Sequence, residues 1–425
     1  MPEQPKHIVL KAKGLVDGTG APMSSNVAIL ITDGVIQEIG NELEVISPPG
    51  AEEIDLGDKT LMPGMVDAHM HFFGLGTDRP FGGLPTETHI YRALRTAGEA
   101  RKMLEAGITA VRCLGSGHIG PSLKRAIEDK HVPGPRMVTA GHFISSTAGT
   151  FDHISMPLDW VKADDMLADG VEGVRAMVRR RIRQGADVIK VGLSKSGVAG
   201  DGYPAWGEDP LNQIASYSLE EIQALTQEAH RNKLKVSAHC IGDEAVRLAL
   251  KAGVDTIEHG YGISDDTRKM MVDHGALVVS TICQLHFHVI GAARFDYPEW
   301  ARTLFQKHIE VMRSDFEKSL AAGVRYVLGT DLIGYPTHPQ ELAAKEFELA
   351  VEWGMDPMQA IVAGTQGGAE TMSMDNVIGT IETGKWADII GVSGSPVKDI
   401  TTLQRVDFVM QGGQVVRNSV NNLPS

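Results

Sequence analysis

The sequence contains 425 residues, of which 42% are hydrophobic and 22% charged, a composition typical of a globular protein rather than a disordered or fibrous one. Asp and Glu outnumber Lys and Arg by 54 to 40, and the resulting net charge of -14 disfavours nucleic acid as a partner. The three cysteines, Cys113, Cys240 and Cys283, are far apart, which excludes a disulfide framework or a thiolate zinc site as the organising element.

The sequence shows neither a signal-peptide pattern nor an uninterrupted apolar run of about 18 residues. We therefore expect a cytoplasmic protein without a membrane partner.

The two ends of the chain have the sequence pattern of short strands separated by turns. Near the N-terminus, Asp33-Gly34 separates two apolar segments, as in a β-hairpin, and Gly412-Gly413 does the same near the C-terminus. We expect residues 1–63 and 371–425 to form one small composite β-sandwich domain.

The middle of the chain alternates strand and helix about eight times. Ala-Gly pairs before several strands, such as Ala106-Gly107, Ala252-Gly253 and Ala322-Gly323, fit helix ends that turn directly into the next strand. This pattern predicts an α/β fold in which residues 64–370 form a (β/α)8 TIM barrel. The expected strands are 65–71, 109–114, 136–143, 187–193, 234–240, 254–259, 276–282 and 325–331, and the expected helices are 91–106, 119–130, 171–184, 219–232, 243–252, 265–274 and 301–322.

Residues that commonly bind metals occur at the ends of five of these strands. In such barrels the chemistry lies at the carboxyl ends of the strands. His69 and His71 are two residues apart, so both side chains face the same side of a strand. The set is completed by a lysine, two more histidines and an aspartate: Lys190, His239, His259 and Asp331. Imidazole and carboxylate suit zinc and similar divalent ions, so the pattern predicts a metal centre inside the barrel mouth.

The segments MVDAHMH, DVIKVGL, VSAHC, TIEHG and LGTD, with VDGTG and IGTIETGKWADIIGV at the two ends, resemble the amidohydrolase superfamily over essentially the whole chain. The resemblance is strongest to its imidazolonepropionase-like branch, which includes prolidase-like Xaa-Pro and Xaa-Arg dipeptidases and ochratoxin-cleaving amidases. It implies a binuclear metal-dependent hydrolase that cleaves amide bonds by attack of a metal-bridging hydroxide.

The resemblance also assigns roles to the residues at the strand ends. His69, His71 and Asp331 would hold a first metal, and His239 and His259 a second, with Zn²⁺ as the expected ion at both sites. Lys190 would bridge the two ions as N6-carboxylysine, a carbamate formed with CO₂, and Asp331 would be the catalytic acid and base. Independently, a lysine ammonium among histidines inside a barrel is costly unless it is neutralised or converted. Lys195, just past the strand, is the alternative candidate.

Substrate contacts are less clearly marked. The candidates are His142, His153, Tyr217 and His338, although packing at a helix entry is the favoured role for Tyr217 and His338 fits ordering of the site. We expect Cys283, His286 and His288 to form a solvated loop after the seventh strand, and Cys240 to be buried and inert. Aromatic residues are frequent in the expected pocket loops, which favours an apolar or aromatic substrate group: Phe72, Phe73, Phe81, Phe143, Tyr203, Trp206, Phe287 and Phe295.

Three functions remain open on these grounds. The first is the binuclear amidase, acting on a dipeptide, an N-acyl amino acid or an aryl amide, including ochratoxin-like substrates. The second is a mononuclear deaminase or cyclic-amide hydrolase of the same superfamily, and the third is a non-catalytic scaffold that has lost its metals. The resemblance also implies a homo-oligomer.

Overall fold

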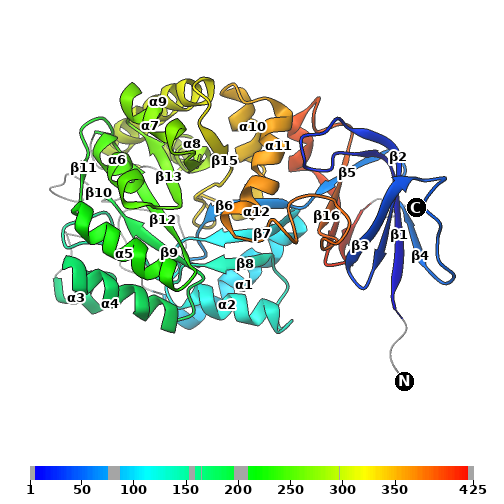
Figure 1. Ribbon diagram of the computed structural model, residues 1–425, viewed down its shortest axis with the longest axis horizontal. Helices are drawn as coiled ribbons and strands as arrows, with labels where there is room; N and C mark the ends of the chain where they lie inside the picture. The colour runs from blue at the N-terminus through cyan, green and yellow to red at the C-terminus, as the bar shows by residue number, and fades with distance from the viewer. Residues whose placement is uncertain are drawn as a thin grey trace.

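The computed structural model describes residues 5–74, 87–152, 158–163, 165–195, 209–295 and 297–419. It has two parts, a barrel and a sheet built from both ends of the chain, which lie side by side in Figure 1. No helix in the described ranges is long and apolar enough to cross a membrane.

The barrel consists of eight parallel strands in two hydrogen-bonded groups, β6-β7-β8 and β9-β12-β13-β14-β15. Backbone bonds join the groups at both edges: Asp187 N–H donates to Thr139 O (2.8 Å), and Ala68 N–H donates to Leu328 O (3.2 Å). The predicted TIM barrel is therefore confirmed. Its strands are β6 (Met65–Met70), β7 (Ile108–Cys113), β8 (Arg136–Thr139), β9 (Val188–Gly192), β12 (Lys235–Ile241), β13 (Thr256–Tyr261), β14 (Leu277–Val279) and β15 (Arg325–Val327).

Helices surround this barrel in Figure 1. The predicted Ala-Gly turns occur as expected, because Gly107, Gly253 and Gly323 all adopt positive φ (92°, 75° and 90°) between a helix and the next strand. The helices are α1 (His89–Glu105), α2 (Ile119–Glu128), α3 (Leu158–Ala163), α4 (Gly170–Arg183), α5 (Leu219–Arg231), α6 (Asp243–Ala252), α7 (Asp265–Asp273), α8 (Ile282–Arg294), α9 (Glu299–Ala321), α10 (Lys345–Glu352), α11 (Pro357–Ala363) and α12 (Gln366–Thr371). Two 3₁₀ helices, η1 (Gln340–Leu342) and η2 (Ile400–Gln404), and a short hairpin of β10 (Ser194–Lys195) and β11 (Ile214–Ala215) complete this set.

Helix α8 corrects one prediction. We expected Cys283, His286 and His288 in a solvated loop, but all three belong to α8, and Cys283 and His288 are fully buried. The reason lies 64 residues away, in Glu346 of α10. Its carboxylate accepts hydrogen bonds from Ile282 N–H (2.9 Å) and Cys283 N–H (2.7 Å), which satisfies the first free amides of the helix.

The terminal domain is one continuous sheet of order β18-β17-β16-β5-β1-β2-β3, with β4 paired to β1. It curls over its own core, and Ala387, just before β16, links its two hairpin turns: Ala387 N–H donates to Gly34 O (2.8 Å) and Gly413 N–H donates to Ala387 O (3.1 Å). Its strands are β1 (His7–Leu15), β2 (Ser24–Thr32), β3 (Val35–Asn41), β4 (Glu52–Asp55), β5 (Lys59–Pro63), β16 (Ile389–Ser393), β17 (Val406–Gln411) and β18 (Gln414–Asn418).

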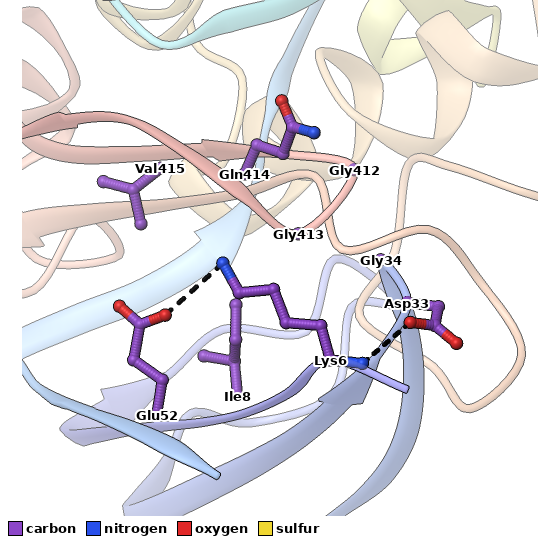
Figure 2. A pocket seen from close by; sticks show the side chains of 9 residues that line it. All are labelled: Lys6, Ile8, Asp33, Gly34, Glu52, Gly412, Gly413, Gln414 and Val415. Atoms are coloured by element: carbon purple, nitrogen blue, oxygen red, sulfur yellow. Dashed lines mark hydrogen bonds and ion pairs between the residues drawn. The ribbon is translucent and has the colours of Figure 1, made fainter. Parts of the chain in front are cut away.

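A hollow of about 580 Å³ lies where these turns meet (Figure 2). Lys6 crosses it, with its ammonium 3.4 Å from Glu52 and its backbone N–H donating to Asp33 at 2.9 Å. The residues that line it contain no histidine or cysteine, and none of the predicted site residues lies there. The predicted metal ligands lie instead in the barrel.

Candidate metal centre

The barrel brings the predicted ligands together in its interior. The side chains of the four histidines and Lys190 are almost completely buried, and Asp331 is 6% exposed. Ring centroids link the histidines in one cluster: His69 lies 5.3 Å from His71 and 5.2 Å from His259, which lies 4.5 Å from His239. Five strand ends distant in sequence thus converge on one site.

His71 is oriented by a backbone carbonyl. Its Nδ1 lies 2.8 Å from Gly115 O, so this nitrogen carries the proton and donates it to the carbonyl. The other nitrogen, Nε2, lies 2.8 Å from Asp331 Oδ1. This arrangement directs the ring lone pair of His71 and the Asp331 carboxylate toward the same point.

His69 stands between Lys190 and Glu258. Its Nε2 lies 3.3 Å from Lys190 Nζ and 3.5 Å from Asp331 Oδ1, whereas its Nδ1 lies 2.9 Å from Glu258 Oε2. Burial lowers the pKa of His69 far below its ordinary value, and neighbouring Lys190 lowers it further. The ring is therefore neutral, the state in which imidazole binds metals.

His259 reaches the site through an unusual backbone. In the β12–β13 pair, His239 lies opposite Glu258, and Cys240 lies opposite His259, so simple alternation would turn His259 away from the barrel interior. His259 instead adopts φ +71°, next to a register shift in this strand pair. Its Nε2 consequently lies 2.9 Å from His239 Nδ1, and its Nδ1 lies 2.7 Å from Thr281 Oγ1.

Strained backbone is concentrated around these residues. Thr281 and Asp331 also adopt positive φ (56° and 55°), a region that non-glycine residues seldom occupy. Asp331 is held there by its N–H, which donates to His69 O at 2.6 Å. Such strain often occurs at functional sites, where the surrounding structure enforces it.

Lys190 is only 1% exposed and lies on β9. Burial lowers its pKa from 10.5 to about 8, although Glu258 and Asp331 oppose the shift. A larger fraction of the amine is thus neutral near pH 8 than for an exposed lysine, and only the neutral amine can react with CO₂. The alternative candidate, Lys195, is exposed on β10.

Sequence reasoning missed a buried ion pair beneath the histidines. Arg112 of β7 donates through Nη2 to Glu258 Oε1 at 2.8 Å, and both side chains are fully buried. Burial would raise the pKa of Glu258, but Arg112 and Lys190 outweigh it and the net shift is downward. Alternation from Thr256 would have turned Glu258 inward, which was the available signal.

Three phenylalanines flank the site. Phe73 stacks on His71 (centroids 4.8 Å apart, planes 3° apart), and Phe151 meets His239 edge-on at 5.8 Å. Phe143 lies between them, 4.0 Å from Phe151 and 5.6 Å from His71. We call Phe73, Phe143 and Phe151 the aromatic wall. Of the other predicted pocket aromatics, Phe72 is buried in the core, and Phe81, Tyr203 and Trp206 lie outside the described residues.

The described contacts of the predicted substrate-binding residues do not favour a role in binding substrate. Tyr217 is 6% exposed in the helix layer and its hydroxyl donates to Ala168 O (2.9 Å), which corresponds to packing. His338 is fully buried, with Nε2 3.3 Å from Gln284 O, and burial lowers its pKa to about 3. The His142 ring packs 5.0 Å from His118. His153 lies outside the described residues.

The donor set fits a divalent ion. One ligand atom each from His69, His71 and Asp331 lie within 4.8 Å of one another, and all three residues are buried. Two neutral imidazoles and a carboxylate are a combination that suits zinc and related ions. Because the second nitrogen of His71 is already committed to a carbonyl, its ring is oriented for this use.

The fold and this site define a metal-dependent hydrolase of the TIM-barrel type. The sequence profile of the amidohydrolase family matches residues 60–416, and the chain belongs to that family. It is a hydrolase that acts on carbon–nitrogen amide bonds.

Individual relatives extend over nearly the whole chain. Ochratoxinase from Aspergillus niger is 30% identical over 446 residues, covering 98% of this chain and 88% of that protein. The crystal structure of a Xaa-Pro dipeptidase with bound methionine is 29% identical with a TM-score of 0.87, covering 96% of this chain and 99% of that one. A prolidase complexed with N-methylphosphonate-L-proline is 29% identical with a TM-score of 0.85, covering 97% and 100%. An imidazolonepropionase from Geobacillus kaustophilus, 22% identical over 428 residues, is also among the relatives. The resemblance to the imidazolonepropionase-like and prolidase-like proteins is thus confirmed.

Proposed function

We propose that the protein is a binuclear metal-dependent amidase that cleaves a small-molecule amide with an apolar or aromatic group beside the scissile bond. The observation that carries the proposal is the convergence of four buried histidines, Asp331 and Lys190 on one point of the barrel interior. His69, His71 and Asp331 would hold the first ion, and His239 and His259 the second.

Lys190 is the proposed bridge between the two ions. Its Nζ lies 3.3 Å from His69 Nε2, and its strand β9 pairs with β12, which carries His239, so Lys190 is close to a ligand of each group. Conversion to N6-carboxylysine with CO₂ would replace a cation by an anion with two oxygen donors. This change of sign favours two divalent ions, which a lysine ammonium would repel.

When bound, the ions supply Lewis-acid chemistry, acidifying a water molecule and polarising the scissile carbonyl. Asp331 accepts the proton of the attacking water at its carboxylate and passes it to the leaving nitrogen, acting first as base and then as acid. The backbone hydrogen bond from Asp331 N–H to His69 O keeps the Asp331 carboxylate in position during this transfer. His71 does not take part in the proton transfer, because its Nδ1 keeps its proton and donates it in a hydrogen bond to Gly115 O.

The aromatic wall favours an apolar substrate group. Because its rings contact His71 and His239, a substrate held between the two groups of ligands would lie against them. Apolar burial and ring stacking would then contribute to binding. The names of the relatives are compatible with this class, since an ochratoxinase and prolidases are among them.

A substrate panel tests the proposal. The purified enzyme would be assayed on N-acyl-phenylalanines, Xaa-Pro and Xaa-Arg dipeptides, aryl amides and ochratoxin A, before and after chelation. We expect amide hydrolysis that chelation abolishes and Zn²⁺ restores, with the highest kcat/KM for substrates that carry an aromatic group. Full turnover of the metal-free protein would refute the metal mechanism. A preference for small polar amides would refute the role of the aromatic wall.

A further inference from the structure

We propose that Glu258, held by Arg112, is a positioning residue that fixes the Nδ1 proton of His69 and so presents the Nε2 lone pair of His69 to the first metal. The inference rests on the metal centre proposed above, and it concerns two residues to which that mechanism gives no role.

The two oxygens of Glu258 have different surroundings. Oε1 accepts three hydrogen bonds, from Arg112 Nη2 (2.8 Å), Ser237 Oγ (2.7 Å) and Thr256 Oγ1 (2.6 Å). Oε2 lies 2.9 Å from His69 Nδ1, a close contact that lacks the alignment of a hydrogen bond, and neither of these two atoms has a hydrogen-bond partner among the described residues. The carboxylate is thus clamped by one oxygen and offers the other to the imidazole.

Arg112 fixes the clamp from the opposite strand. Its Nε donates to Ala68 O at 2.6 Å, and its Nη1 donates to Thr256 Oγ1 at 2.9 Å. Ala68 immediately precedes His69 on β6, so Arg112 ties the backbone beside the ligand to the carboxylate that faces the ligand's ring. Guanidinium is suited to this role because its planar group holds several acceptors at once.

The proton arrangement of His69 follows from these contacts. A neutral imidazole has one N–H, and a carboxylate beside Nδ1 stabilises the tautomer that carries the proton there. Nε2 is then unprotonated, and it is the nitrogen that faces Lys190 (3.3 Å) and Asp331 (3.5 Å). Carboxylate–histidine–metal arrangements of this kind commonly strengthen metal binding.

A purely structural role is the competing explanation. Barrel interiors are usually filled by branched apolar side chains, and a buried ion pair can often be replaced by apolar residues without loss of stability. What distinguishes this pair is its geometry, because the unclamped oxygen meets a ring nitrogen of a proposed metal ligand. The test must therefore measure the tautomer of His69 and the affinity for metal, and not stability alone.

The experiment compares wild type with Glu258→Gln and with a matched control, Asp388→Asn. Asp388 is also buried (3% exposed) and ion-paired, to Arg136 at 2.7 Å, but it lies between the barrel and the terminal sheet. Two quantities are measured: the affinity for each ion by chelator competition, and the His69 tautomer in metal-free protein by ¹⁵N-histidine NMR, assigned with His69→Asn.

We expect Glu258→Gln to weaken one of the two ions by roughly 10- to 100-fold and to remove the Nδ1–H signature of His69. Asp388→Asn should be less stable than wild type but should keep the wild-type ion affinity and the wild-type tautomer of His69. Wild-type affinity together with an unchanged His69 tautomer in Glu258→Gln would overturn the proposal, as would equal loss of affinity in both variants.

Two further arms keep the test decisive. If Glu258→Gln does not fold, Thr256→Val removes one of the three donors to Oε1 and one acceptor of Arg112. It should produce a smaller change in the same direction, and no change would overturn the inference. If wild type binds no ion, the proposed function fails, whereas the tautomer comparison in metal-free protein still decides the role of Glu258.

Discussion

Thr281→Val is a sharp test of how the second metal site is held. Thr281 is fully buried, and its Oγ1 lies 2.7 Å from His259 Nδ1. Valine matches the shape of threonine and is also β-branched, so the strained backbone at φ +56° is affected equally by both residues. The substitution therefore removes the oxygen while leaving the rest of the turn similar.

The magnitude follows from the lost hydrogen bond. A buried polar atom left without its partner costs about 1–3 kcal/mol, and about 1.4 kcal/mol corresponds to a tenfold change in an equilibrium constant. We expect one ion to bind roughly 10- to 100-fold more weakly, the range found for partners of metal-binding histidines. The first ion, held by His69, His71 and Asp331, should be unaffected.

The assay is chelator competition followed by kcat/KM at limiting Zn²⁺. Thr281→Ser retains a hydroxyl and is the control, with affinity close to that of wild type. If Thr281→Val bound both ions as tightly as wild type, the assignment of His259 as a ligand oriented through Nδ1 would be wrong.

Three further predictions concern Asp331, Lys190 and Glu99. Asp331→Asn should fold normally but turn over at least ~10²-fold more slowly, and near-normal turnover would show that its proton-transfer role is misassigned. Lys190→Ala should lose at least one ion and nearly all activity, with partial rescue by short carboxylates; an unmodified Lys190 beside two bound ions, seen in electron density or intact mass, would refute the bridge. Glu99 is 6% exposed, and burial raises its pKa from 4.5 to about 7. Because the pKa is higher in the folded state, its contribution to stability is complete below pH 4.5 and is lost as the pH rises through about 7. Relative to wild type, Glu99→Gln should therefore gain stability between pH 5 and pH 8, by about 3 kcal/mol at most, measured by denaturant unfolding; an equal difference at both pH values would contradict this.

The metal-binding residues at the strand ends could be predicted from the sequence, because their positions depend on local rules. The spacing of His69 and His71 indicates a shared face, and Ala-Gly pairs mark the helix–strand turns that the structure contains. The same rules were insufficient for His259. Its side chain reaches the site only because of a positive φ and a register shift, and neither is encoded in a hydrophobic pattern.

Non-local contacts explain what the sequence could not show. The local sequence predicts a loop where α8 forms, because the acceptor of the helix's first amides is Glu346, which lies far along the chain. Glu258 was visible beside His259, but its arrangement depends on donors from three different strands, at Arg112, Ser237 and Thr256. Such convergence becomes apparent only when the barrel is assembled.

The number of ions per chain tests the binuclear centre most directly. Protein reconstituted with Zn²⁺ and bicarbonate, freed of loosely bound metal and analysed by elemental mass spectrometry, should contain close to two ions per chain. Both ions are expected, because His69, His71 and Asp331 form one group of ligands and His239 and His259 the other. A count near one would indicate a mononuclear enzyme, and a count near zero a scaffold; either result would contradict the proposed centre.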